Sequence, residues 1–177
     1  MLKKIICAGF GGQGVLTAGK ILLYAAYKND LYGTWFPSYG NEMRGGAAHC
    51  NVIISDKKIA SPYADHPNLL MAMNDLSLEK FEPLMEEGGE LFVNTTLVKD
   101  HEYRGDINVY KADVTDIAKE LGSKNNGNIV MLGKIIKETE LFTIEHLEKS
   151  MCQYFEDNGK GAYNEKNIEL LRAGYNL

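Results

Sequence analysis

The pattern of hydrophobic and polar positions at the start of the chain predicts a strand, a tight turn and a helix. The segment Lys4–Ala8 is short and apolar and stops at glycines, which is typical of a buried strand. The segment Val15–Lys28 is rich in Ala, Leu and Lys, contains no proline and has only Gly19 as a weak point, which favours a helix. The glycines between the two segments therefore form a strand-to-helix turn.

Strand-like and helix-like segments alternate along the rest of the chain. We expect strands at Tyr32–Phe36 (ended by Pro37), Cys50–Ser55, Lys58–Ser61, Asn68–Met73, Leu91–Asn94 and Ile107–Lys111. We expect helices at Leu76–Met85, Val114–Leu121, Asn128–Glu138, Ile144–Phe155 and Glu165–Ala173. Because strands that alternate with helices form a mostly parallel sheet, the pattern predicts the α/β class.

The expected architecture is a single Rossmann-like domain over residues 1–177, with a mostly parallel sheet and helices on both of its faces. The segments Cys50–Ser55 and Lys58–Ser61 are joined by the polar turn SDKK, which predicts an antiparallel hairpin near residues 50–61. The sequence shows no repeat, low-complexity tract or linker that would divide this domain.

The composition and charge of the chain limit the kinds of partner that it can bind. The hydrophobic content of 45% fits one compact domain with a core, and the formal net charge is −5. No block of Lys and Arg is present, so we expect no nucleic-acid partner. The aliphatic stretches are too short to cross a bilayer, and the first apolar run stops too soon for a signal peptide. We therefore expect no membrane association and a cytoplasmic location.

Cysteine and histidine spacing offers no metal or catalytic set. The cysteines Cys7, Cys50 and Cys152 are odd in number and form no C-x-x-C, so we expect reduced thiols and no cluster or zinc held by this chain. The histidines do not occur at metal-binding spacing, and no nucleophile motif surrounds the serines or threonines. We therefore predict no metal site and no catalytic residue in this chain.

The turn itself reads GFGGQG, and Gly9, Gly11 and Gly14 have the G-x-G-x-x-G spacing of a dinucleotide-binding loop. Glycines there permit a tight turn, the approach of a phosphate and close packing of the helix, whose N-terminus attracts anions. Gly12 and Gln13 complete the candidate cofactor-binding turn. The alternative is that the glycines serve only the turn.

An NAD site needs more than this turn. It requires an acidic residue at the end of the second strand to bind the ribose hydroxyls. Asp30 has about the right separation but precedes the strand, whose end reads WFPSY at Trp35–Tyr39 and contains no carboxylate. The sequence therefore disfavours NAD.

A second loop, PSYGNEMRGG at Pro37–Gly46, follows the second strand. If the first two strands are neighbours, as in the common doubly wound order, this loop faces the glycine turn across a crevice. Its candidate binding residues are Ser38, Tyr39, Glu42, Arg44, Gly45 and Gly46. Arg44 can contact a phosphate or carboxylate, or pair with Glu42 instead. Ser38 and Tyr39 either donate hydrogen bonds to a ligand or serve the turn, and His49 is an acid–base group or a structural residue.

The two loops together resemble the gamma subunit of 2-oxoacid:ferredoxin oxidoreductases, in the pyruvate ferredoxin/flavodoxin oxidoreductase gamma-domain family. The similarity lies in GGQGV and PSYGNEMRGG, and continues through LMAMN, SLEKFEP and GGELFVN. The 2-oxoglutarate and 2-oxoisovalerate types are the most similar, and the chain length fits a complete subunit. Asn41 stands where the family often has proline, and His49 stands where a small polar residue is expected.

This resemblance implies a multi-subunit enzyme of anaerobic metabolism. Its complex converts a 2-oxoacid, here best matched by 2-oxoglutarate, and coenzyme A to acyl-CoA, carbon dioxide and reduced ferredoxin. Thiamine diphosphate and iron–sulfur clusters would belong to the alpha, beta and ferredoxin-like delta subunits. This chain would aid coenzyme A binding and assembly, hold no cofactor firmly, and be inactive alone.

The resemblance implies that Gly11, Gly12, Gln13, Gly14, Arg44 and Gly46 lie at or near a coenzyme A or subunit contact. An apolar group formed by Trp35, Phe36, Tyr39 and Met43 is a candidate partner surface. The alternatives are a free-standing Rossmann-type oxidoreductase or a regulatory binding module. Self-association of the isolated chain also stays open.

Overall fold

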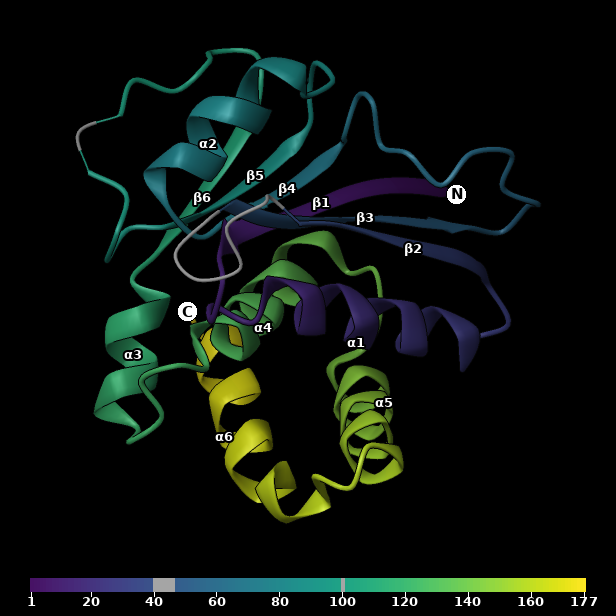
Figure 1. Cartoon of the computed structure of the whole chain (residues 1–177), viewed down its shortest axis with the longest axis vertical. Coiled ribbons are helices and arrows are strands. Elements are labelled where there is room, and N and C mark those ends of the chain that lie inside the picture. Colours follow the sequence, from purple (N-terminus) through teal and green to yellow (C-terminus); the bar gives the residue numbers. More distant parts are fainter. Residues whose placement is uncertain (40–46, 100) are drawn as a thin grey trace.

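The computed structural model describes residues 1–39, 47–99 and 101–177. The strands are β1 Leu2–Phe10, β2 Tyr32–Tyr39, β3 Ala47–Ser55, β4 Leu69–Ala72, β5 Glu90–Asn94 and β6 Asn108–Ala112. The helices are α1 Val15–Tyr27, α2 Asp75–Phe81, α3 Val114–Glu120, α4 Gly127–Thr139, α5 Ile144–Asp157 and α6 Asn164–Tyr175, with short 3₁₀ turns η1 Glu82–Leu84 and η2 Gly161–Tyr163. The six strands form one sheet in the order β2-β3-β1-β4-β5-β6 (Figure 1).

The sheet is mixed, and its one reversed strand is β3. The pairs β1–β4, β4–β5 and β5–β6 are parallel, whereas β3 is antiparallel to both β1 and β2. The α/β class with a mostly parallel sheet is thus confirmed. β2 runs in the same direction as β1, but β3 separates them, so the expectation that the first two strands are neighbours was wrong.

The hairpin predicted near residues 50–61 was wrong, because β3 has other partner strands. Its first strand exists within β3, but Lys58–Ser61 forms no strand, and β3 pairs instead with β2 and β1. The last six residues of β3 are all buried, whereas Lys57 and Lys58 are exposed. A segment that is buried on both faces is more stable between two strands than at an edge, which places β3 inside the sheet.

The second strand also continues beyond its predicted end. β2 includes Pro37 and runs to Tyr39, rather than stopping at Phe36. Pro37 pairs with Cys50 of β3, and β2 has no second neighbour in the described sheet. An edge strand tolerates proline because one side of its backbone needs no ladder hydrogen bond.

Helices cover both faces of the sheet, as predicted. α1, α3, α4, α5 and α6 lie on one face and α2 with η1 on the other (Figure 1). Alternate strand residues divide between the two layers, so that Ile5 and Cys7 pack toward α1 while Ile6 and Ala8 pack toward α2. Among the described residues, no helix is long and apolar enough to cross a membrane.

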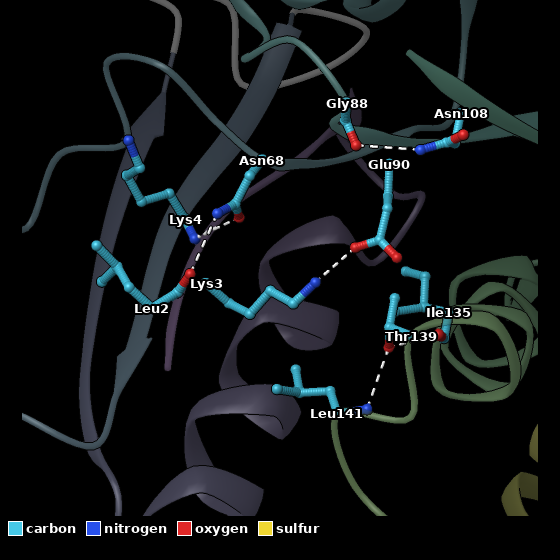
Figure 2. Close-up of polar contacts among 10 residues, drawn as sticks. All are labelled: Leu2, Lys3, Lys4, Asn68, Gly88, Glu90, Asn108, Ile135, Thr139 and Leu141. Carbon is cyan, nitrogen blue, oxygen red and sulfur yellow. Dashed lines mark hydrogen bonds and ion pairs between the residues drawn. The ribbon is translucent and has the colours of Figure 1, made fainter.

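Polar contacts tie the amino-terminal ends of the parallel strands together (Figure 2). Lys3 of β1 pairs with Glu90 of β5 at 2.5 Å. Between them, the Asn68 side chain accepts a hydrogen bond from the Lys4 amide at 2.8 Å and donates one to the Leu2 carbonyl at 3.1 Å. These contacts fix the register of β1, β4 and β5 at their amino-terminal ends, which lie opposite the glycine turn.

Candidate functional site

The glycine turn lies at the edge of the sheet where the parallel strands end. It follows β1 and leads into α1, and the parallel strands β4, β5 and β6 end along the same edge of the sheet. Ligands of open α/β sheets bind at this edge, because the loops diverge there. The structure thus places the predicted Gly9–Gly14 segment where a binding turn is expected.

The second loop falls mainly outside the described residues. Asn41, Glu42, Met43, Arg44, Gly45 and Gly46 lie in the undescribed range, as does Gly40, so their predicted role stays a prediction. The described residue that follows them, Ala47, pairs with Phe10 at the start of the glycine turn. β2 also ends at this edge, so Ser38 lies on the same side of the sheet as the turn, although β3 separates the two strands.

Positive φ angles explain two of the glycines. Gly12 has a φ of 100° and Gly14 a φ of 69°, which is backbone that side-chain-bearing residues rarely adopt. Gly14 is the N-cap of α1, and in the described structure no side chain caps this end and no acid occupies its first turn. The N–H groups of the first turn of α1 are therefore available to an anion.

The Gln13 side chain stabilises the turn through three hydrogen bonds. Its Oε1 accepts hydrogen bonds from the Phe10 amide at 2.6 Å and from Asn74 Nδ2 at 3.0 Å, and its Nε2 donates to the Met73 carbonyl at 3.2 Å. A Cβ on Gly9 would lie 2.6 Å from this Oε1. Gly9 and Gln13 therefore shape the turn and join it to the residues after β4.

Asn128 joins the turn to a second helix. The Asn128 side chain, in the first turn of α4, donates a hydrogen bond through Nδ2 to the Gly14 carbonyl at 3.0 Å. A Cβ on Gly14 would approach this Nδ2 to 2.5 Å. The amino-terminal ends of α1 and α4 thus meet at Gly14. Asn128 was not predicted from the sequence, where its only signal was its place at the start of a predicted helix.

Two hollows flank the turn. The larger, with a volume of about 390 Å³, lies between the turn, the start of α4 and the corner that joins α5 to α6. The smaller, of about 200 Å³, lies toward the residues after β4 and the start of α3, and contains Lys124. Gly12 and Asn125 line both hollows, so a ligand at the exposed Gly12 can extend to either side.

His49 lies on the opposite face of the sheet from α1. It pairs with Ala8 and Ser38, and its ring packs on Phe81 with centroids 4.7 Å apart. Burial, and then the positive charge of Lys80, lower the pKa of His49 to about 4. The imidazole is therefore neutral at neutral pH, and its packing on Phe81 favours the structural alternative over an acid–base role.

The described geometry does not supply the carboxylate of an NAD site. Asp30 lies in the turn between α1 and β2, exposed and with a φ of 52°, at the edge of the sheet opposite the glycine turn. The strand next to β1 on that side is the antiparallel β3, which does not have the parallel arrangement of a dinucleotide-binding half.

The predicted apolar partner surface is wrong in one respect. Trp35 and Phe36 lie on opposite faces of the sheet, because successive strand residues alternate. Trp35 packs under α1, with Lys20 Nζ 4.7 Å from its ring centroid. Phe36 is 39% exposed and packs against Tyr63 on the other face. The Tyr39 side chain and Met43 lie outside the described residues.

Cys7 and Cys50 face each other across β1 and β3, beneath the start of α1. Both are free and fully buried, and Cys50 Sγ lies 3.6 Å from the Val15 carbonyl, to which it donates. The hydrogen bond with Cys50, followed by burial, raises the pKa of Cys7 well above its ordinary value. These are packed thiols, whereas Cys152 is partly exposed. Within the described ranges, no three side chains are arranged for a metal ion.

Comparison with known proteins gives a consistent result. The family model for pyruvate ferredoxin/flavodoxin oxidoreductase matches residues 4–177. The 2-oxoglutarate synthase subunit KorC of Methanothermobacter marburgensis is 34% identical over 184 residues, covering 100% of this chain and 97% of KorC. The ketoisovalerate oxidoreductase subunit VorA of the same organism is 33% identical over 97% of this chain, which spans only 35% of VorA.

Solved structures show the same fold. The gamma subunit of keto/oxoacid ferredoxin oxidoreductase from Geobacter sulfurreducens has a TM-score of 0.87 at 28% identity, covering 99% of this chain and 95% of that subunit. A 2-oxoglutarate:ferredoxin oxidoreductase from Magnetococcus marinus, with 2-oxoglutarate, coenzyme A and succinyl-CoA bound, has a TM-score of 0.82 at 22% identity, covering 98% of this chain and 31% of that chain. The resemblance that the two loops indicated is confirmed.

Proposed function

Because the chain belongs to the pyruvate ferredoxin/flavodoxin oxidoreductase family, we propose that it is the gamma subunit of a 2-oxoacid:ferredoxin oxidoreductase. The observation that carries this proposal is the end-to-end match with KorC, in which both chains are covered almost completely. KorC is a 2-oxoglutarate synthase subunit, which favours 2-oxoglutarate as the 2-oxoacid. The complex would form succinyl-CoA and carbon dioxide from 2-oxoglutarate and coenzyme A and pass electrons to ferredoxin.

Within this complex the chain has an auxiliary role. Alpha, beta and ferredoxin-like delta subunits would hold the thiamine diphosphate and iron–sulfur clusters, which supply the decarboxylation and electron transfer. This chain would support assembly and coenzyme A binding through Gly11, Gly12 and Gly14 of the turn and through Arg44 and Gly46 of the second loop. The uncapped start of α1 and the exposed Gly12 support this role, because a phosphate can approach the backbone there. Two buried, free cysteines are consistent with a cytoplasmic complex.

Co-purification tests the proposal directly. The chain, carrying an affinity tag, is isolated from its native cell under anaerobic conditions, and the accompanying proteins and cofactors are identified. We expect stoichiometric recovery of thiamine-diphosphate-binding and iron–sulfur subunits. The recovered complex should reduce ferredoxin with 2-oxoglutarate and coenzyme A faster than with pyruvate or 2-oxoisovalerate. A chain that comes alone and reduces NAD with a 2-hydroxy acid contradicts the proposal.

A further inference from the structure

A buried asparagine lies behind the residues that form the smaller hollow. Asn94 is the last residue of β5 and is 0% exposed. Its side chain donates hydrogen bonds to Met73 and Thr115, and its carbonyl accepts one from the Leu97 amide at 3.1 Å. These three partners line the smaller hollow. Asn94 therefore supports the hollow without reaching it.

The Asn94 side chain contributes two donated hydrogen bonds. Its Nδ2 donates to the Met73 carbonyl at 3.1 Å and to Thr115 Oγ1 at 2.9 Å. Because a carbonyl can only accept, the contact with Met73 determines which end of the amide points toward it. The Oδ1 atom is buried and has no hydrogen-bond partner among the described residues. Since an unpaired buried acceptor is costly, the two donated bonds are what an amide provides at this position.

The Met73 carbonyl connects Asn94 to the glycine turn. It also accepts from Gln13 Nε2 at 3.2 Å, so that Asn94 and Gln13 share one acceptor. Gln13 accepts in turn from the Phe10 amide at 2.6 Å. A chain of hydrogen bonds thus runs from the end of β5, through the residue after β4, to the start of the turn. At Thr115 it also reaches the first turn of α3.

We propose that Asn94 is a positioning residue, which holds the Met73 carbonyl in place for Gln13 and thereby fixes the conformation of the glycine turn. The proposal rests on the proposed function, because it makes this turn pre-organised for coenzyme A by a residue outside both glycine-containing loops. A turn that is already ordered spares its ligand the cost of ordering it. Because Asn94 is too deeply buried to contact a ligand, its loss should weaken binding and leave the chemical step unchanged.

The assembled complex tests the proposal through the separate responses of KM and kcat. Asn94→Leu keeps a side chain that branches at the same atom and removes both donors. We expect the apparent KM for coenzyme A to rise about fivefold, which is the usual effect of one lost hydrogen bond, and kcat to change less than about twofold. An unchanged KM overturns the proposal.

Asn68 provides the matched control at the amino-terminal ends of the strands. Its side chain also makes two hydrogen bonds, with the Lys4 amide and the Leu2 carbonyl. Asn68→Leu removes both of them far from the glycine turn, so the KM for coenzyme A should stay within about twofold of the wild-type value. If Asn68→Leu raises KM as much as Asn94→Leu does, the effect of Asn94 is general destabilisation and the proposal is overturned.

A double substitution tests the route through Gln13. Because Asn94 acts through Gln13, the two effects should not add. In a Gln13→Met background, which has already lost these hydrogen bonds, Asn94→Leu should raise KM by less than about twofold more. Two full, independent increases would overturn the route through the Met73 carbonyl.

Hydrogen exchange of the Phe10 amide gives a measurement that needs no substrate. This amide donates to Gln13 Oε1, so its exchange reports the position of the Gln13 side chain. In the full chain, Asn94→Leu should speed its exchange about fivefold and Asn68→Leu should not. If Asn94→Leu does not fold, Asn94→Ser, which is smaller and too short to replace Nδ2, should have the same effect. Wild-type exchange in the Asn94 variant overturns the proposal.

The outcomes for this proposal and for the proposed function are distinct. If the Asn94 variant has wild-type exchange and a wild-type KM in an intact complex, the positioning role is overturned and the gamma-subunit role stands. If exchange at Phe10 accelerates as expected but the chain co-purifies with no partner, the positioning of the turn is supported and the gamma-subunit role is contradicted.

Discussion

Gly14 combines two constraints in one residue. Its φ of 69° favours glycine, and its position leaves no room for a Cβ beside Asn128. Gly88 has a similar φ of 75°, but a Cβ there would meet nothing within 4 Å. Comparing Gly14 with Gly88 therefore separates the effect of backbone strain from that of steric contact. At Gly14, the lack of a side chain lets α1 pack against Asn128 of α4.

We expect Gly14→Ala to destabilise the protein more than Gly88→Ala. Gly88→Ala should cost about 1 kcal/mol, from the left-handed backbone alone. Gly14→Ala should cost about 3 kcal/mol, because Asn128 must also move. Urea unfolding of both variants measures the difference. Equal free energies of unfolding would mean that the Gly14–Asn128 contact contributes nothing.

His49 makes stability depend on pH at the residue scale. Its pKa is about 4 in the folded protein and about 6.5 when unfolded, so the unfolded chain binds the proton more tightly. Stability is therefore lost as the pH falls from about 6.5 toward about 4. Since the ring is only partly buried, we expect a loss on the order of 1–2 kcal/mol across this window.

The measurement compares the wild type with His49→Gln at pH 7 and at about pH 5. At pH 7 the two proteins differ by the lost packing on Phe81 alone. At the lower pH the wild type should lose more stability than the variant, since glutamine does not titrate. Parallel losses in the two proteins would contradict the assigned pKa.

At the scale of elements, two glycines let α4 and α6 approach closely. A Cβ on Gly174 would lie 1.8 Å from the Val130 carbonyl oxygen, and one on Gly133 would lie 2.0 Å from that of Leu171. Both contacts are with backbone, which cannot move aside as a side chain can. This packing sets the position of α6 against α4.

We expect Gly174→Ala to destabilise the protein by about 3 kcal/mol or more, although alanine favours a helix by about 1 kcal/mol over glycine. The α6 helix would be displaced from α4, because the new Cβ would overlap the Val130 carbonyl. Gly105→Ala is the control, because a Cβ at Gly105 meets nothing within 4 Å. Thermal unfolding of both variants measures the difference in stability. A variant as stable as the wild type would contradict the close packing.

Local sequence patterns predicted most of the strands and helices, but not how the strands pair in the sheet. The strand–turn–helix at the start, the later strands other than Lys58–Ser61 and the five later helices appear close to their predicted limits, because periodicity and glycine or proline signals act locally. The place of β3 between β1 and β2 in the sheet did not follow from these local signals. Buried segments of similar length can pair at several places, and only the combined pairing with β1 and β2 selects one.

At the scale of the whole molecule, the chain is a small part of a larger proposed assembly. The glycine turn, Ser38 and Ala47 lie at one edge of the sheet, whereas the Lys3–Glu90 ties occupy the other. Partner chains and coenzyme A would therefore meet this protein at the first edge. Arg44 lies between Ser38 and Ala47 in the sequence, outside the described residues, so its part in that contact stays a prediction.

We expect Arg44→Ala to raise the apparent KM for coenzyme A of the assembled complex about tenfold or to weaken assembly, because a guanidinium contacts phosphate or carboxylate strongly. Lys57→Ala is the control, since Lys57 follows β3 at the opposite edge. Steady-state kinetics and size-exclusion chromatography check the two outcomes. Wild-type values in both would assign Arg44 a purely structural role.

The sequence by itself determined the class of fold, the glycine turn and the family. These depend on local spacing and on contiguous motifs, which survive without knowledge of the distant parts of the chain. Only the tertiary structure decided that β3 separates β1 from β2 and that Gln13 and Asn128 hold the turn. The physical reason is that burial and hydrogen-bond pairing are set by residues far away in sequence. Asn128, which donates a hydrogen bond to the Gly14 carbonyl, lies 114 residues from it in the sequence.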